Sequence, residues 1–240
     1  MMALVLTVSI VLVGCSSGSD RSVGPDPAST DSQSPDWPAG SGPGPVIAVV
    51  GDSYTTGSEM DSGPASNWSA LMAEGLRRDR PDLQMHVEAG AGSGYAVGGA
   101  RGLDFEQLAR LSMPTDADLI IVFGSLNDGR SQPSTVAVAA RSLMTWLQDE
   151  RPDATVLVIG PPWMDERVPT NLLLIRDEVR TAALDIGATF LDPLAEGWFA
   201  GDAASLIGDD GVHPTDDGQH YLAELVTPRV EQLLAAPPTP

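Results

Sequence analysis

Apolar runs and helical patterns alternate along residues 46–240. Five stretches are continuously apolar or alternate apolar with polar residues, as strands do. These expected strands are Val46–Val50, Leu83–Ala89, Asp118–Phe123, Ala154–Ile159 and Ala188–Leu191. The expected helices are Asn67–Arg78, Leu103–Leu111, Ser134–Asp149, Asn171–Ile186 and one within Asp216–Ala235. Strands separated by helices predict βαβ units, one parallel sheet and, at this length, one α/β domain.

A short apolar run, Ala3–Val13, precedes this domain. It is too short to span a bilayer, which takes about 20 residues, but it has the length of a signal-peptide core. It is followed by Gly14, Cys15 and Ser16, a pattern that resembles a bacterial lipobox, in which the cysteine is lipidated. We therefore expect a lipoprotein signal peptide over residues 1–15 and an extracytoplasmic protein, membrane-anchored or secreted. The alternative is an ordinary secretory signal that contains Cys15 by chance.

Residues 16–45 are expected to form a disordered linker. Of these 30 residues, 19 are Ser, Gly or Pro, and almost none could enter a core. As a flexible coil, the linker would reach roughly 30 Å, enough to hold the domain of residues 46–240 away from a membrane.

The charge and the residue types present exclude several classes of protein. The formal net charge is −20, and all 13 basic residues are arginine. The absence of lysine excludes a Walker A site, a Schiff-base lysine and a Ser-Lys dyad. The acidity argues against nucleic acid as a partner and against membrane contact other than through an anchor. A single cysteine excludes a cysteine zinc site, and three histidines argue against a His-rich metal site. We therefore expect no metal. We also expect no cofactor and a monomeric protein.

Polar residues that could take part in catalysis follow the first and third expected strands. Ser53 comes after Val46–Val50, where a strand would turn into a helix, and Asn127 comes after Asp118–Phe123. A serine there could act as a nucleophile or simply cap the helix, and an asparagine amide could stabilise an oxyanion or form a turn. Because parallel strands carry their sites at their carboxyl ends, both side chains are expected at one edge of the sheet.

An Asp-His pair precedes the last helix. Asp210 lies three residues before His213, with Asp209 as a second acidic candidate. A carboxylate at this spacing can fold back to hold the imidazole Nδ1–H and leave Nε2 free to act as a base. The alternative is a solvated turn before the helix.

A glycine-rich block, Gly90–Gly98, follows the second expected strand. It allows a backbone to approach a ligand closely. From Gly92 it also reads G-x-G-x-x-x-G, a variant of the dinucleotide-binding fingerprint. It follows the second strand, however, and no long helix comes after it, so nucleotide binding is not favoured.

Together these segments supply a nucleophile, a glycine N–H, an amide donor and an Asp-His pair, which are the parts needed for acyl transfer. At this point the sequence resembles the SGNH (GDSL-type) hydrolases over residues 46–234. The motifs stand in the family's order: Gly51-Asp52-Ser53, the glycine block, Gly124-x-x-Asn127 and Asp210-x-x-His213. The resemblance implies a three-layer α/β/α, flavodoxin-like fold with about five parallel strands.

By motif match, the resemblance assigns roles to individual residues. Ser53 would be the nucleophile, His213 the base and Asp210 its partner. The oxyanion hole would consist of the Ser53 backbone N–H, a glycine N–H and the Asn127 side chain. Gly94 matches the family's Ser-Gly pattern, and Gly92 is the alternative.

The substrate is expected to be a short-chain acyl ester, such as an acetyl ester on a polysaccharide. Four aromatic residues near the expected strand ends could line a pocket or pack in the core: Tyr54, Tyr95, Trp163 and Trp198. Two other functions stay open from the sequence. An acyltransferase would use the same acyl-enzyme, and a non-catalytic glycan-binding lipoprotein would use the same cleft.

Overall fold

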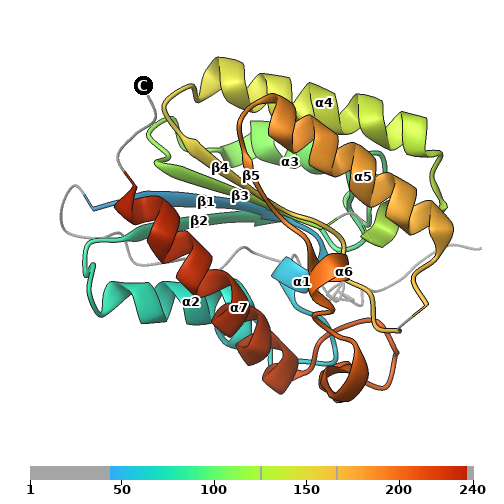
Figure 1. The fold of residues 1–240 in the computed structure, drawn as a ribbon. Helices are drawn as coiled ribbons and strands as arrows, with labels where there is room; N and C mark the ends of the chain where they lie inside the picture. The colour runs from blue at the N-terminus through green and yellow to red at the C-terminus, as the bar shows by residue number, and fades with distance from the viewer. Residues whose placement is uncertain (1–43, 125, 166, 237–240) are drawn as a thin grey trace, which may run out of the picture. The chain divides into compact units, whose positions relative to one another are not determined.

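The computed structural model describes residues 44–124, 126–165 and 167–236, which contain a five-stranded parallel sheet with helices on both faces (Figure 1). The strands are β1 (Val46–Gly51), β2 (Gln84–Ala89), β3 (Leu119–Phe123), β4 (Thr155–Ile159) and β5 (Thr189–Leu191). Their order in the sheet is β2-β1-β3-β4-β5. The expected α/β fold with a flavodoxin-like parallel sheet is confirmed.

The expected signal peptide, Cys15 and residues 16–43 of the expected linker lie outside the described residues. Gly44 and Pro45, at the end of that linker, already belong to the domain, because the Gln84 backbone N–H donates to the Pro45 carbonyl oxygen at 3.0 Å. None of the helices in the described ranges is long and apolar enough to cross a membrane.

The helices are divided between the two faces of the sheet. The α-helices are α1 (Ser53–Thr56), α2 (Trp68–Arg77), α3 (Phe105–Ser112), α4 (Pro133–Glu150), α5 (Thr170–Asp185), α6 (Pro193–Glu196) and α7 (Asp216–Ala235). Short 3₁₀ helices are η1 (Pro64–Ser66), η2 (Leu126–Arg130) and η3 (Gly201–Leu206). Helices α2 and α7 cover one face, and α3, α4 and α5 cover the other, which gives three layers (Figure 1).

Alternating side chains of the central strands supply both halves of the core. In β1, Ile47 and Val49 face α2 and α7, whereas Ala48 and Val50 face α3 and α4. Since β1 and β3 are covered on both faces, their residues are apolar without interruption, as expected for buried parallel strands.

Local signals set the helix starts close to the expected positions. Asn67 caps α2 by accepting a hydrogen bond from the Ser69 N–H, and Asp104 and Gln107 form a reciprocal capping box at α3. The expected helix and strand boundaries therefore differ from the observed ones by only one or two residues. The short helices α1, α6, η1, η2 and η3 were not predicted, because single turns leave no periodic pattern.

The strand order places the topological switch point of the sheet between β1 and β3. After β1 the chain passes through α1 to α2 on one face, and after β3 it passes through η2 to α4 on the other. Connections that diverge in this way leave a space at the carboxyl ends of the strands, where ligands bind in open α/β sheets. The residues that follow these two strands include Ser53 and Asn127.

Candidate active site

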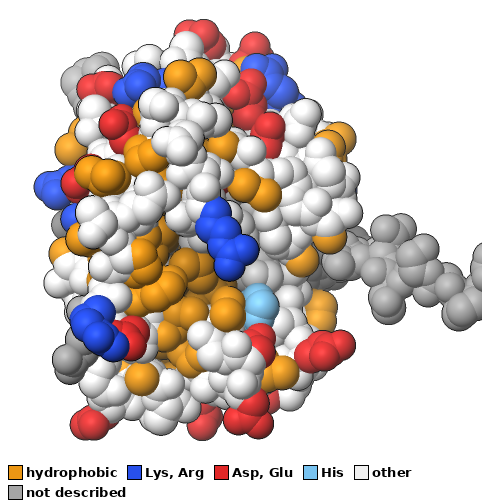
Figure 2. Space-filling model, turned by 90° about the vertical axis from the view of Figure 1, so that its right-hand side faces the viewer, with side chains coloured by type: hydrophobic (Ala, Val, Ile, Leu, Met, Phe, Trp, Pro, Cys, Tyr) orange, Lys and Arg blue, Asp and Glu red, His pale blue; other side chains and the backbone are white. Residues whose placement is uncertain are grey.

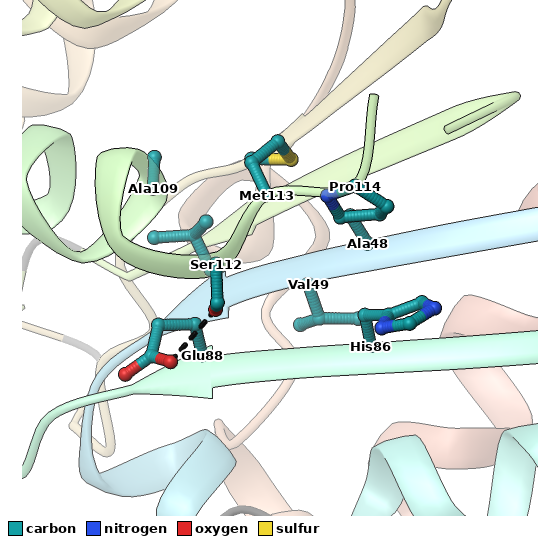
Figure 3. Close-up of a pocket in the computed structure, with 9 residues that line it drawn as sticks. Ala48, Val49, His86, Glu88, Ala109, Ser112, Met113 and Pro114 are labelled. Atoms are coloured by element: carbon teal, nitrogen blue, oxygen red, sulfur yellow. Dashed lines mark hydrogen bonds between the residues drawn. The ribbon is translucent and has the colours of Figure 1, made fainter. Parts of the chain in front are cut away.

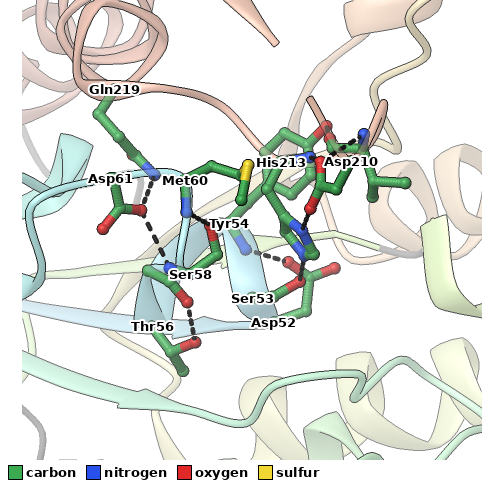
Figure 4. Close-up of polar contacts among 12 residues, drawn as sticks. Asp52, Ser53, Tyr54, Thr56, Ser58, Met60, Asp61, Asp210, His213 and Gln219 are labelled. Carbon is green, nitrogen blue, oxygen red and sulfur yellow. Dashed lines mark hydrogen bonds and ion pairs between the residues drawn. The ribbon is translucent and has the colours of Figure 1, made fainter. Parts of the chain in front are cut away.

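Ser53 and His213 form a direct hydrogen bond at this edge of the sheet (Figure 4). The distance between Ser53 Oγ and His213 Nε2 is 2.9 Å, although 160 residues separate the two in the chain. Ser53 is the first residue of α1, directly after the Asp52 N-cap. Its backbone N–H makes no hydrogen bond within the described part of the chain. The hydroxyl and a free amide therefore lie at the same strand end.

Asp210 holds the opposite side of the imidazole. His213 Nδ1 lies 2.5 Å from Asp210 Oδ2, and Asp210 Oδ1 accepts the backbone N–H groups of Val212 and His213, each at 2.9 Å. Although partial burial acts to raise it, these hydrogen bonds lower the pKa of Asp210 to about 2. A carboxylate beside Nδ1 keeps the proton on that nitrogen, so Nε2 can accept the Ser53 proton. The pairing selects Asp210 over Asp209 as the partner of His213.

Tyr54 connects the serine turn with the histidine loop. Its hydroxyl donates to the Val212 carbonyl oxygen at 2.6 Å, and its ring centroid lies 6.2 Å from that of His213. Burial raises the pKa of Tyr54 above its usual range, so the phenol stays protonated and can donate this hydrogen bond. Tyr54, which follows Ser53, therefore positions Val212, which precedes His213.

Asn127 lies between the serine turn and the glycine block. Its side-chain NH₂ group donates to the Ser93 carbonyl oxygen at 2.8 Å and to Asp52 Oδ2 at 3.2 Å. The amide nitrogen therefore faces the loop after β2 and the loop after β1. This arrangement places the Asn127 amide beside the serine turn, and its role as an oxyanion donor stays a prediction.

The glycine block forms a tight turn clamped by a buried carboxylate. Asp128 Oδ2 accepts the Tyr95 N–H at 2.7 Å, and Asp128 Oδ1 accepts the Ala96 N–H at 2.9 Å. The Gly94 N–H donates to the Val97 carbonyl oxygen at 2.8 Å within this turn. That bond conflicts with the expectation that the Gly94 amide is open to an oxyanion.

Gly92 fits the open-amide role better than Gly94. Its amide makes no hydrogen bond within the residues that the structure describes, and it precedes Ser93, whose carbonyl contacts Asn127. Its φ of 75° lies in the left-handed region, which favours glycine. The motif spacing alone did not separate the two glycines, since the turn hydrogen bond leaves no signal in the sequence.

Hydrophobic side chains gather in a hollow beside a histidine on the face at the carboxyl ends of the strands (Figure 2). Arginine and acidic side chains lie around this hollow. Partly buried apolar residues of the loops that follow β3, β4 and β5 extend the core toward this edge: Leu126, Met164, Leu206 and Ile207. The site thus combines polar groups with an apolar surface.

Three of the four aromatic candidates belong to the core. Tyr54, Tyr95 and Trp198 are only 1%, 2% and 2% exposed, so packing, one of their two expected roles, is confirmed. Tyr54 packs edge-on against Phe123, beneath the site. Trp163 is half-buried and remains a candidate for lining the pocket.

The other histidines lie apart from the serine. His86, on the edge strand β2, lines a small crevice with Glu88 and Ser112, whose side chains are hydrogen-bonded at 2.8 Å (Figure 3). This crevice has a volume of about 10 Å³, which leaves room for one water at most. His220 is exposed on α7. Across the described ranges, no three His, Cys, Asp or Glu side chains are grouped so that they could hold a metal ion.

The fold and the site define a class: an α/β protein with a Ser-His-Asp arrangement at the carboxyl edge of a parallel sheet. Residues 49–221 match the family described as GDSL-like lipase/acylhydrolase. A GDSL lipase of Mycobacterium tuberculosis is 38% identical over 196 residues, which cover 78% of this chain and 82% of that protein. The chain therefore belongs to the GDSL-like family of SGNH hydrolases.

Solved structures share this fold. A family two carbohydrate esterase from Clostridium thermocellum, in complex with cellohexaose, has a TM-score of 0.61 and 18% identity, covering 79% of this chain and 64% of that chain. A carbohydrate acetylesterase from Sinorhizobium meliloti has a TM-score of 0.60 and 18% identity, covering 79% and 99%. At these identities the likeness concerns the fold.

Proposed function

We propose that this protein is a serine esterase that hydrolyses short-chain acyl esters through an acyl-enzyme on Ser53. The observation that carries the proposal is the continuous hydrogen-bonded path from Ser53 Oγ through His213 to Asp210. The cap of α1 is Asp52, so Ser53 is free of that role, and a serine with only a structural role would need neither a base on its hydroxyl nor a carboxylate behind that base. The same geometry argues against a purely glycan-binding role, for which this path has no use.

In the proposed mechanism, His213 removes the Ser53 proton as Oγ attacks the ester carbonyl carbon. The oxyanion that forms is stabilised by the Ser53 N–H, the Asn127 side chain and a backbone N–H of the glycine block, for which Gly92 is the better candidate. His213 then protonates the departing alkoxide, which leaves an acyl group on Ser53. Water activated by His213 attacks this ester and releases the acid.

The substrate class that we propose is acetyl and other short acyl esters, with carbohydrate as the alcohol. Aromatic residues make up only 5% of the chain, and the apolar hollow of Figure 2 is open to the surface. The relative from M. tuberculosis is named a lipase, whereas the two structural neighbours are named carbohydrate esterases. Acyl length is therefore the property to measure.

The test is release of p-nitrophenol from acetyl, butyryl, octanoyl and decanoyl esters by residues 44–240. We expect kcat/KM to be highest for the acetyl or butyryl ester and turnover to be lost in Ser53→Ala. Ser112→Ala is the matched control, because this serine lies in the crevice of Figure 3, outside the site. A steady rise in kcat/KM toward the decanoyl ester would contradict the substrate class but not the esterase.

Transfer of the acyl group to a sugar hydroxyl would use the same acyl-enzyme. Product analysis with and without a sugar acceptor separates the two reactions. We expect free acid as the main product in both cases. An acylated sugar as the main product would identify an acyltransferase instead.

We also propose that lipidation at Cys15 anchors the protein outside the cytoplasm. The support for this proposal is the apolar run of residues 3–13 followed by Gly14 and the chain's single cysteine.

A further inference from the structure

Asp52 is a buried carboxyl group for which the proposed mechanism has no role. It is 1% exposed, although it lies next to Ser53 in the sequence. Its Oδ1 accepts the Tyr54 N–H at 2.9 Å, as expected for an N-cap, whereas its Oδ2 faces the Asn127 side-chain nitrogen at 3.2 Å. Capping alone would use one oxygen, so the second contact calls for a separate explanation.

The surroundings of Asp52 make room for this second contact. Gly124, at the end of β3, has a φ of 145°, and a Cβ placed there would lie 2.8 Å from Asp52 Oδ2. A side chain at position 124 would therefore meet the carboxyl group that approaches Asn127. The close passage of β3 past Asp52 depends on glycine.

The chemistry of the contact determines which end of the Asn127 amide faces the site. An amide side chain has a donor end and an acceptor end of nearly the same shape. Two acceptors, Asp52 Oδ2 and the Ser93 carbonyl oxygen, both face the nitrogen of Asn127. Rotating the amide by half a turn would place its oxygen against both acceptors, which is unfavourable.

We infer that Asp52 is a positioning residue: its 3.2 Å contact, longer than the 2.8 Å bond to Ser93, holds the second N–H of the Asn127 amide beside the serine turn, where the oxyanion replaces Asp52 as its acceptor. This inference rests on the proposed function, because it assigns Asp52 a role through an oxyanion donor of that reaction. Asp52 itself does not contact the reacting atoms. A carboxyl group is required because both of its oxygens face donors.

The substitution Asp52→Asn separates this role from capping. The new amide can still accept the Tyr54 N–H through its oxygen, but its NH₂ group then faces the NH₂ group of Asn127. Asn127 must rotate or move away, and the oxyanion loses a donor. We therefore expect kcat to fall about 10²-fold, as for loss of one oxyanion-hole donor, with little change in KM.

A double-mutant cycle with Asn127→Ala tests whether Asp52 acts through Asn127. If it does, Asp52→Asn combined with Asn127→Ala lowers kcat no further than Asn127→Ala alone. A merely structural role would give independent effects that multiply. Asp118→Asn is the matched control: its carboxylate accepts the Val46 N–H at 2.7 Å at the opposite end of the sheet, and kcat should stay unchanged.

A pH profile supplies a second test that does not need the Asp52 variant to fold. Burial, together with the charge of Asp128, raises the pKa of Asp52 to about 7, although the Tyr54 N–H opposes this. When Asp52 is ionised, both of its oxygens can accept hydrogen bonds, one from the Tyr54 N–H and one from Asn127. When it is protonated, one oxygen carries a proton that competes with these donors. The wild-type kcat profile should therefore contain an ionisation near this pH that is absent from Asn127→Ala.

The outcomes distinguish this inference from the proposed function. Wild-type turnover that depends on Ser53, with unchanged kcat in Asp52→Asn, would overturn the role of Asp52 and leave the esterase intact. Multiplying effects in the cycle, or identical pH profiles for wild type and Asn127→Ala, would also overturn it. No ester turnover by the wild type would overturn the proposed function itself, and this inference with it.

Discussion

The hydroxyl of Tyr54 donates a 2.6 Å hydrogen bond to the carbonyl oxygen of Val212. Tyr54 follows Ser53 in α1, and Val212 precedes His213, so this bond connects the two segments that must stay in register for proton transfer. The Tyr54 ring also packs against Phe123 at the end of β3, which fixes the phenol to the core of the sheet.

The first prediction concerns this contact. Tyr54→Phe keeps the ring but removes the hydrogen bond, which is worth on the order of 1 kcal/mol. We expect kcat to fall about 3- to 10-fold with little change in KM, and the free energy of unfolding to fall by about 1 kcal/mol. Steady-state kinetics and urea unfolding measure both.

Tyr221→Phe is the control for this substitution. Tyr221 packs against Phe199 near the same core, and its hydroxyl makes no hydrogen bond within the described residues. An equal loss of kcat in the two variants would show that the Tyr54 hydroxyl has no specific positioning role.

The second prediction concerns the turn of the glycine block. A Cβ at Gly94 would lie 2.5 Å from Asp128 Oδ2, the oxygen that accepts the Tyr95 N–H. Gly94→Ala should therefore displace the loop beside Asn127, lowering both kcat and the melting temperature.

Gly75→Ala provides the comparison. Gly75 lies within α2, and a Cβ there would meet no atom within 4 Å. Alanine favours a helix by up to about 1 kcal/mol over glycine, so this variant should be at least as stable as the wild type, with unchanged kcat. A Gly94→Ala protein with wild-type kinetics and melting temperature would show that the Asp128 clamp tolerates displacement.

The third prediction concerns stability and pH. The pKa of Asp52 is raised from 3.8 to about 7, so the folded protein holds this proton to higher pH than the unfolded chain. The stability associated with this proton is complete below about pH 4 and is lost as pH rises toward 7, at up to about 1.4 kcal/mol per pH unit. The pKa of Asp210 is lowered from 3.8 to about 2. The stability that its carboxylate contributes is therefore present above about pH 4 and is lost as pH falls toward 2.

Urea unfolding of wild type and Asp52→Asn at pH 4.5, 6 and 8 measures this effect. We expect the wild type to lose stability relative to the variant as pH rises. A difference between the two proteins that does not change with pH would mean that Asp52 titrates in the folded state as it does in the unfolded chain.

The fourth prediction concerns the N-terminal segment. When the full chain is expressed in a bacterium that processes lipoproteins, the wild type should enter the detergent phase on Triton X-114 partition. Cys15→Ser should move it to the aqueous phase, because the acceptor of the lipid is lost. Wild-type protein found only in the aqueous phase would contradict lipidation.

The sequence was informative about the fold because the central strands are buried on both faces. Uninterrupted apolar runs such as Leu119–Phe123 are typical of interior strands, and Ser53 and Asn127 follow two of these strands closely. Ser53, Asp210 and His213 could be found from motif spacing because the fold brings the strand ends together.

Other parts of the site depend on interactions that no local pattern records. The choice between Gly92 and Gly94 follows from a turn hydrogen bond between the Gly94 N–H and the Val97 carbonyl oxygen. The role of Tyr54 requires contact with a residue 158 positions away. Such relationships arise from tertiary packing.

Active-site labelling can show whether Ser53 is a nucleophile activated by His213. The protein is treated with a fluorophosphonate, digested, and the modified peptide is identified by mass spectrometry. We expect one adduct, on Ser53, that is absent from Ser53→Ala and forms much more slowly in His213→Ala. An unmodified Ser53 in folded wild-type protein, or ester turnover retained by Ser53→Ala, would contradict this role of Ser53.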